Sequence, residues 1–353
     1  MRYLGMLARA TILGLLIIAV SLSRPGLAQE KVVLKILGQP TDAGAIQKNK
    51  EQPFFETLGN ILGSHFIVEY TPLDKSGIPE ADQLKALRSG QVQIASLRIS
   101  EVGADAPAFL GLDLVGMNTD FKTGRRATDA YLPVLDLTLQ RQLAVKLLGV
   151  WPFGPQYLFC SKPLAGLGDL KGRKVRVYDS DLAKLIETAG GVPIRLGFAE
   201  TAHALADGRL DCAVTSPASA VAARWTDATK YVLPIAFQLG INAYAMSLDS
   251  WNGLPRKQQT QLASAIRSLA AEIWTYSLQL SENAIQCGAE ESSCVSDQAE
   301  HLTEAPIVRS DIRLLRSGLR RFSFPDWAKI CDRTDSTCSA DWKKSVGTLF
   351  GMP

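Results

Sequence analysis

Few residues of this chain stand at the spacing that catalysis requires. Its three histidines, His65, His203 and His301, are scattered along the sequence. None belongs to an H-E-x-x-H motif, and there is no G-x-S-x-G elbow, no P-loop and no G-x-G-x-x-G fingerprint. His203 falls within a predicted helix, where a surface or core role is favoured over that of a base. We therefore predict a binding protein that is not an enzyme, with no cofactor and no metal.

The N-terminus predicts export. Arg2 and Arg9 give a basic start, an uncharged apolar run follows from Ala10 to Leu22, and small residues lead to Ala28. This is the layout of a signal peptide spanning residues 1–28, and it predicts a periplasmic protein. The alternative is an uncleaved N-terminal anchor, although the apolar run is short for a membrane span.

The charge balance argues against nucleic acid as a partner. Residues 1–28 hold three arginines and no acid, so the 38 basic residues fall to 35 after cleavage and equal the 35 acidic ones. Nucleic-acid-binding proteins usually carry a basic patch or stripe. The neutral mature chain therefore favours another class of ligand.

Six cysteines could form disulfides in an exported chain. Cys287 and Cys294, and likewise Cys331 and Cys338, are each separated by six residues in polar surroundings. This spacing predicts two local disulfides, each contributing roughly 2.5 kcal/mol in the chain-entropy model. The remaining two, Cys160 and Cys212, lie in apolar strand-like stretches. They are either bonded to each other or two buried thiols, and zinc is disfavoured because no C-x-x-C pair exists.

Strands alternate with helices in two separate stretches, which is typical of α/β domains with mostly parallel sheets. Predicted strands begin near residues 31, 65 and 91 in the first stretch, and near 156, 172, 192 and 209 in the second. We predict two lobes, each a mixed or parallel sheet flanked by helices. The first comprises residues 31–152 plus 242–282, and the second comprises 153–241 plus 283–353.

A long helical pattern starts at Leu254, with Leu262, Ile266, Leu269 and Ile273 at near-helical spacing. About 30 residues would reach roughly 45 Å, which is longer than one lobe of this size. We predict that this helix bridges both lobes. No long linker is present, so the lobes must be joined by short crossings near Trp151 and Ile241 that act as hinges.

The stretch from Leu164 to Pro217 resembles the DctP-like, C4-dicarboxylate-binding proteins of TRAP transporters. The matching motifs are "DLKGRKVRV" from Asp169, "GGVP" from Gly190, "FAE" from Phe198 and "DGRLDCA" from Asp207, with "WNGLP" opening the long helix at Trp251. The resemblance implies a two-lobed periplasmic-binding-protein architecture with a ligand cleft. It also implies a small organic acid as ligand and TRAP-type membrane permease subunits as partners.

Arg176, the arginine of the "RV" pair, is the residue that the resemblance assigns to the ligand carboxylate. A guanidinium group can hold both carboxylate oxygens at once, although a surface ion pair is the alternative role. Many relatives carry a second arginine in a "W-x-x-G-x-R" stretch, where "WPFGPQ" places Gln156. We therefore expect a monocarboxylate or related polar acid. Arg98 would supply a charge from the opposing lobe, or else is a solvated loop arginine.

Further cleft candidates come from the carboxyl ends of predicted strands, where two-lobed proteins bind ligands. Phe198 matches a family position that packs on the ligand, with a core aromatic as the alternative. The other candidates are Ser216, Gln39, Thr41 and Asp42, with Trp151 and Phe153 as a wall. Two other functions stay open: a ligand-sensing periplasmic protein that docks on a membrane sensor, and an exported enzyme.

Overall fold

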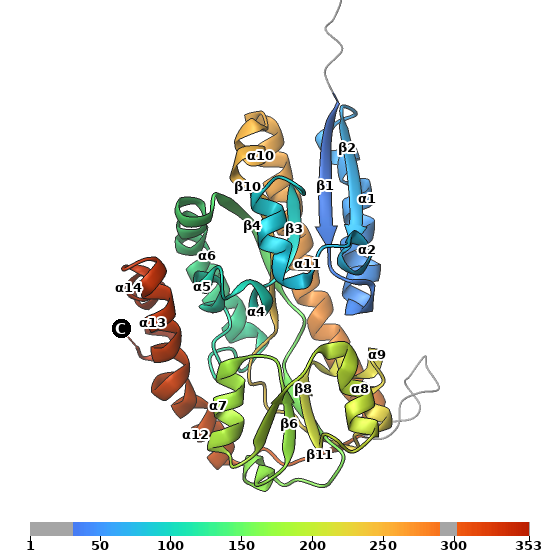
Figure 1. The fold of residues 1–353 in the computed structure, drawn as a ribbon, viewed down its shortest axis with the longest axis vertical. Helices are drawn as coiled ribbons and strands as arrows, with labels where there is room; N and C mark the ends of the chain where they lie inside the picture. The colour runs from blue at the N-terminus through green and yellow to red at the C-terminus, as the bar shows by residue number, and fades with distance from the viewer. Residues whose placement is uncertain (1–30, 290–301, 353) are drawn as a thin grey trace, which may run out of the picture.

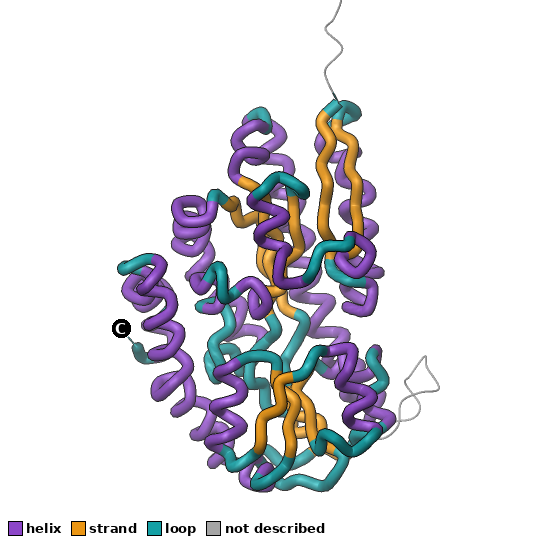
Figure 2. Tube along the Cα trace, in the orientation of Figure 1, coloured by secondary structure: helices purple, strands orange, loops and turns teal. Residues whose placement is uncertain are grey.

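Two separate β-sheets organise the molecule, one in each lobe, as Figures 1 and 2 show. The computed structural model describes residues 31–289 and 302–352. The predicted signal peptide lies outside these residues. Within them, no helix combines the length and the apolar character needed to span a bilayer.

The first lobe contains a five-stranded sheet in the order β2-β1-β3-β10-β4. Strand β10 runs antiparallel to both of its neighbours, whereas β1 is parallel to β2 and β3. Helices α1, α6 and α11 pack on this sheet. The strands are β1 (Val32–Gly38), β2 (Phe66–Pro72), β3 (Ile94–Arg98), β4 (Val145–Pro152) and β10 (Ile241–Ser247).

Helices of the first lobe follow the local pattern of the sequence. Helix α1 buries Phe55, Leu58 and Leu62, which recur on one face at helical spacing. The helices before the long one are α1 (Gln52–Leu62), α2 (Leu73–Ser76), α3 (Gln83–Arg88), α4 (Ile99–Val102), α5 (Pro107–Leu110), α6 (Phe121–Leu143) and α10 (Leu248–Gly253).

The second lobe contains a six-stranded sheet in the order β11-β9-β5-β8-β6-β7. Strand β5 is antiparallel to β8 and β9, so this sheet is also mixed. The strands are β5 (Tyr157–Cys160), β6 (Lys174–Val177), β7 (Val192–Arg195), β8 (Cys212–Thr215), β9 (Tyr231–Leu233) and β11 (Thr303–Glu304). Its helices are α7 (Ser180–Thr188), α8 (Phe198–Ala206) and α9 (Pro217–Ala222). Asp179 caps α7 by accepting the Leu182 N–H at 2.7 Å.

The bridging helix is confirmed. Helix α11 runs from Arg256 to Ala289, 34 residues, or about 50 Å at 1.5 Å per residue. Its Ile266 and Ile273 belong to the core of the first lobe, whereas Ile285 packs against a core cluster of the second. Figure 1 shows α11 passing from beside α10 to the level of α9.

Besides helix α11 and the turn from α12 (Arg309–Gly318) to α13 (Phe324–Thr334), two crossings between strands join the lobes, one between β4 and β5 and one between β9 and β10. They lie side by side, since the Phe153 and Gly154 N–H groups donate to the carbonyls of Gly240 and Leu239 at 2.9 and 3.0 Å. The predicted crossings near Trp151 and Ile241 therefore form one paired connection. The Ser277 hydroxyl of α11 donates to the Phe153 carbonyl at 2.7 Å and ties the long helix to it.

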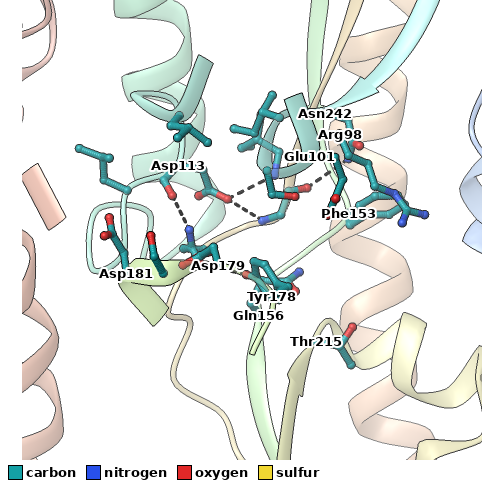
Figure 3. A pocket seen from close by; sticks show the side chains of 18 of the residues that line it. Arg98, Glu101, Asp113, Phe153, Gln156, Tyr178, Asp179, Asp181, Thr215 and Asn242 are labelled. Carbon is teal, nitrogen blue, oxygen red and sulfur yellow. Dashed lines mark hydrogen bonds between the residues drawn. The ribbon is translucent and has the colours of Figure 1, made fainter. Parts of the chain in front are cut away.

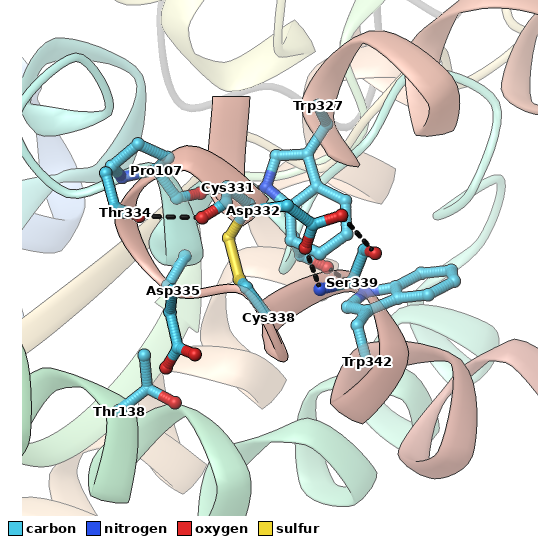
Figure 4. Close-up of a disulfide and its surroundings, with 12 residues drawn as sticks. Pro107, Thr138, Trp327, Cys331, Asp332, Thr334, Asp335, Cys338, Ser339 and Trp342 are labelled. Atoms are coloured by element: carbon cyan, nitrogen blue, oxygen red, sulfur yellow. Dashed lines mark hydrogen bonds between the residues drawn. A yellow bond between two sulfur atoms is a disulfide. The ribbon is translucent and has the colours of Figure 1, made fainter. Parts of the chain in front are cut away.

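The C-terminal helices correct the predicted lobe boundary, because not all of residues 283–353 join the second lobe. Strand β11 and helix α12 (Arg309–Gly318) pack there, but α13 (Phe324–Thr334) and α14 (Cys338–Ser345) return to the first lobe. Trp327 and Trp342 are buried in the core of the first lobe and donate to the carbonyls of Pro107 and Gly111 at 2.8 and 2.7 Å. Figures 1 and 4 show these helices lying beside α5 and α6.

The disulfides follow the sequence expectation in part. Cys331 and Cys338 are bonded, as predicted, next to the two tryptophans (Figure 4). Cys160 and Cys212, left open by the sequence, are also bonded, and they face each other across β5 and β8. The predicted pair of Cys287 and Cys294 falls outside the part that the structure describes, because Cys294 lies in residues 290–301 and only the backbone of Cys287 is described.

Candidate functional site

A cavity of about 220 Å³ lies between the two lobes, and both lobes line it. Figure 3 shows Arg98, Glu101 and Asn242 on the side of the first lobe, with Tyr178, Gln156 and Thr215 across from them. Lining residues include Arg98, Glu101, Asp113 and Asn242 of the first lobe, Phe153, Gln156 and Gln238 of the crossings, Arg176, Tyr178, Asp179, Asp181, Phe198 and Thr215 of the second lobe, and Asp326, Trp327 and Ile330 of the C-terminal segment.

Arg176 is the cationic centre of the second-lobe wall. It lies on β6, with only 5% of the residue exposed. Its Nε and Nη1 atoms donate to the carbonyls of Leu196 and Val214 at 3.0 and 2.9 Å, so the guanidinium is fixed in place. Aromatic rings of Tyr178 and Trp225 lie 5.4 and 5.5 Å from its Cζ atom.

The charge of Arg176 has no counter-ion of its own. Both hydrogen-bond partners are neutral carbonyls, and no ion pair with a carboxylate is found for it in the described part of the chain. Burial lowers its pKa to about 10, so the group is still positive at neutral pH. The carboxylates of Glu101 and Asp179 act on this charge only without direct contact. A buried charge that makes no direct ion pair is costly, and an anion entering the cavity would offset that cost.

Arg98 approaches the cavity from the first lobe, but it is already paired. Its Nη1 atom lies 3.0 Å from a Glu80 carboxylate oxygen, and its Nε donates to Gln39 Oε1 at 3.2 Å. Its Cζ atom also lies 5.4 Å from the centre of the Phe153 ring. The charge of Arg98 is therefore largely compensated within the lobe.

A buried carboxylate supports the part of the first lobe that carries Arg98. Glu51 accepts hydrogen bonds from the Gln39 backbone N–H and from the hydroxyls of Ser96, Tyr70 and Tyr244, at 2.6 to 3.0 Å. The Gln39 amide in turn donates to Ser96 and orients its oxygen toward Arg98. Burial raises the pKa of Glu51. Gln39, 1% exposed, therefore supports Arg98 from behind and does not line the cavity.

Five of the predicted site residues line the cavity together: Arg98, Phe153, Gln156, Arg176 and Phe198. Gln156 donates from Nε2 to the Gly154 carbonyl at 2.8 Å. Phe198 stacks on Trp225, with ring centres 5.1 Å apart, and still reaches the cavity. Their roles toward a ligand stay predictions.

Other predicted site residues lie elsewhere. Trp151 is 0% exposed and packs against Phe153 and Tyr244 in the first core, so it does not form a wall. Ser216 caps α9, and its neighbour Ser219 lines the cavity instead. Thr41 is bonded to Asp74 on the surface.

The side chain of the last candidate, Asp42, lies outside what the structure describes. Ala43, the next residue along the chain, lines the cavity.

The C-terminal segment closes one side of the cavity, which sequence reasoning missed. Asp326, Trp327 and Ile330 line it from α13. Asp326 also pairs with Lys184 of α7, and the Ser323 hydroxyl donates to Asp181 at 2.9 Å. No sequence motif predicted that α13 would line the cavity, because this depends on α13 returning to the first lobe.

The described residues include no donor set for a metal ion. No three side chains among their His, Cys, Asp and Glu residues gather in a way that could hold a metal ion. The acidic residues at the cavity are spread over several elements, and Asp179 is used to cap α7. The arrangement is suited to holding a small anion by one guanidinium.

Solved structures share this architecture. The DctP7 receptor of Bordetella pertussis, which binds pyroglutamic acid, is 18% identical with a TM-score of 0.75, covering 90% of this chain and 99% of that one. A TRAP periplasmic solute-binding protein of Desulfovibrio desulfuricans with bound sn-glycerol-3-phosphate is 19% identical, with a TM-score of 0.74 and coverage of 90% and 97%. One of Rhodoferax ferrireducens with bound malonate is 17% identical, with a TM-score of 0.73 and coverage of 90% and 98%.

No curated protein matches the chain in sequence. The model of the family described as "Bacterial extracellular solute-binding protein, family 7", DctP, matches residues 43–305, well over half of the chain. These residues include all of the strands from β2 to β11 and the motifs around Arg176. The chain therefore belongs to the DctP family of bacterial extracellular solute-binding proteins.

Proposed function

We propose that this protein captures a small organic acid in the periplasm and delivers it to the membrane subunits of a TRAP-type transporter. The cavity holds the acid by its carboxylate, and the ligand leaves chemically unchanged. The observation that carries the proposal is Arg176, a buried guanidinium at the cavity with no carboxylate partner in the described chain. The basic, apolar N-terminal run supports export.

The related structures support the class of ligand. Pyroglutamic acid, malonate and sn-glycerol-3-phosphate, bound in three of them, are all small anions. A cavity of about 220 Å³ is of a size for a small molecule rather than a polymer. The paired crossings between the lobes allow a hinge motion that closes the cavity over the ligand.

Binding calorimetry on Arg176→Ala tests the proposal, with pyroglutamate, malonate and lactate as probes and native mass spectrometry to identify a co-purified acid. Removing one partner of a desolvated charged pair typically costs about 2–5 kcal/mol. A tenfold change in the dissociation constant corresponds to about 1.4 kcal/mol. We expect binding of each acid that the wild type takes to weaken at least tenfold.

Arg209→Ala is the matched control, because Arg209 is an exposed arginine of the same lobe that pairs with Asp207. It should leave affinity unchanged. Equal binding by the wild type and Arg176→Ala would overturn the proposed site. A wild-type protein that takes none of the acids and carries no co-purified acid would overturn the proposed ligand class.

A further inference from the structure

We propose that Asn242 recognises a hydrogen-bond donor on the ligand, so that the preferred ligand is a monocarboxylate bearing an N–H or O–H group. This inference rests on the proposed function, because it takes Arg176 as the carboxylate anchor. It adds a second point of recognition on the opposite lobe, and it excludes dicarboxylates as the preferred class.

Asn242 is a buried polar side chain whose acceptor oxygen is unused. It lies on β10, is 0% exposed and lines the cavity. Its Nδ2 donates to the Gly240 carbonyl at 3.2 Å, which fixes the orientation of the amide, because only the NH₂ group can donate to a carbonyl. Its Oδ1 has no hydrogen-bond partner among the described residues. A buried acceptor left in this state favours a donor entering from the cavity.

Asn242 and Arg176 line the cavity from opposite lobes. In the sheet, Asn242 lies directly opposite Arg98 on β3, and the Arg98 Cζ atom lies 5.4 Å from the centre of the Phe153 ring. Figure 3 shows Asn242 beside Arg98, on the far side of the cavity from Tyr178 and Thr215. A ligand held at Arg176 by its carboxylate would therefore present its other end to the first lobe.

The charges around the cavity disfavour a second carboxylate at that end. Arg98 is already paired with Glu80. Glu101 adds a carboxylate to the lining on the first-lobe side, and Asp179 and Asp181 add two more from the second lobe. A second anionic group on the ligand would thus meet an acid and a compensated arginine, whereas a neutral N–H or O–H group would find an acceptor in Asn242.

Trp151 offers the one competing role for Asn242. It lies opposite Asn242 on β4, and its indole Nε1 is likewise without a partner in the described chain. No hydrogen bond joins the two side chains in the structure. If Asn242 served mainly to accept a hydrogen bond from this indole, removing the indole N–H would change ligand preference as much as removing the amide does. The experiment must separate these two roles.

The test uses pairs of acids that differ only in the donor. One pair is pyroglutamate and the lactone 5-oxotetrahydrofuran-2-carboxylate, in which an oxygen replaces the ring N–H. The other is lactate and propionate. The wild type should bind the donor-bearing member of at least one pair about tenfold or more tightly, and more tightly than malonate. In Asn242→Leu this preference should fall to about twofold, with the affinity for the member without a donor retained.

Two further variants make the outcomes distinguishable. Trp151→Phe removes the indole N–H and should keep the preference for the donor-bearing acid. If Trp151→Phe abolishes this preference as Asn242→Leu does, the proposal fails. Arg176→Ala should weaken both members of a pair alike, and its failure to do so would overturn the proposed function instead. A wild type that binds both members equally, or whose co-purified ligand is a dicarboxylate, would overturn the role of Asn242.

Discussion

The carboxylate of Asp113 accepts a hydrogen bond from the backbone N–H of Gly240 at 2.8 Å, which joins the first lobe to the crossing that leads into β10. The same carboxylate accepts the N–H groups of Leu239 and Ile241 and the side-chain amide of Asn118. One buried acid therefore satisfies three consecutive backbone donors of the hinge. Burial raises its pKa to about 6.

Replacing Asp113 with alanine should destabilise the protein, because it removes the acceptor of these backbone donors. Each buried donor left without a partner typically costs about 1–3 kcal/mol. Urea unfolding at pH 7.5 measures the free energy of unfolding, and Asp105→Ala, at an exposed position of the preceding loop, is the control. A loss no larger than that of the control would contradict the role assigned to Asp113.

The pH dependence of stability should also change in Asp113→Ala. The folded-state pKa of Asp113 is raised, from 3.8 to about 6, so the folded protein binds its proton more tightly than the unfolded chain. The stabilisation that this proton contributes is present below about pH 4 and is lost as pH rises through about 6.

Between these pH values the unfolding free energy of the wild type should therefore fall more steeply with rising pH than that of Asp113→Ala. Other buried acids with raised pKa, such as Glu51 and Asp179, are present in both proteins and cancel in the comparison. Urea unfolding at half-unit pH intervals gives both slopes. Parallel curves would show that Asp113 does not titrate in this range.

The two described disulfides should differ in their contribution to stability. Cys160 and Cys212 are 52 residues apart, and Cys331 and Cys338 are 7 apart. In the chain-entropy model, loops of these lengths correspond to about 4 and about 2.4 kcal/mol. The double variant Cys160→Ala/Cys212→Ala should therefore lose more unfolding free energy than Cys331→Ala/Cys338→Ala. Guanidinium unfolding gives the order, and peptide mapping without reductant checks that both bonds exist.

Local patterns explain why much of the fold was predicted. Strand β1, helix α1 and the Asp179 cap of α7 each depend on side chains within a few residues, so periodicity and capping rules identify them. The return of α13 and α14 to the first lobe was not predicted. It depends on Trp327 and Trp342 finding carbonyl partners more than 200 residues away.

The candidate site was predicted only where a motif or a strand end marked it. Arg176 and Phe198 came from motifs, whereas Asn242 and Asp113 carry no local signature, because their roles arise from which strands become neighbours. Trp151 was predicted to line the cavity and does not, because burial also depends on which elements become neighbours. It lies within β4, where the sheet and α11 cover it, whereas Phe153, just beyond the strand end, reaches the cavity.

Gln156 stands where the resemblance to the family motif led us to expect an arginine, and its surroundings indicate what a charge there would do. It is 6% exposed, lines the cavity and donates to the Gly154 carbonyl. Gly240 lies against it, so closely that a Cβ on Gly240 would stand 2.7 Å from Gln156 Nε2. Gln156→Arg would therefore direct its longer side chain into the cavity, where it adds a second positive charge.

Gln156→Arg should raise the affinity for the dicarboxylates succinate and malonate by about tenfold, and should not improve the binding of lactate or pyroglutamate. The reason is that a second desolvated cation gives a second carboxylate a partner, whereas a single carboxylate is already served by Arg176. Calorimetry on the wild type, on Gln156→Arg and on a control variant measures these affinities. Gln91→Arg, at an exposed position, is the control, because exposed charges are worth about 0–1 kcal/mol.

Gln156→Lys separates charge from shape, since it carries the same charge on a thinner side chain. Both charged variants should shift the preference toward dicarboxylates, with the arginine giving the larger gain because it can hold two oxygens at once. If both variants keep the wild-type circular dichroism spectrum and neither gains affinity for a dicarboxylate, then the glutamine at this position does not explain why the protein would prefer a single carboxylate. The preference would then have to come from the first-lobe side of the cavity, where Glu101 and the paired Arg98 lie.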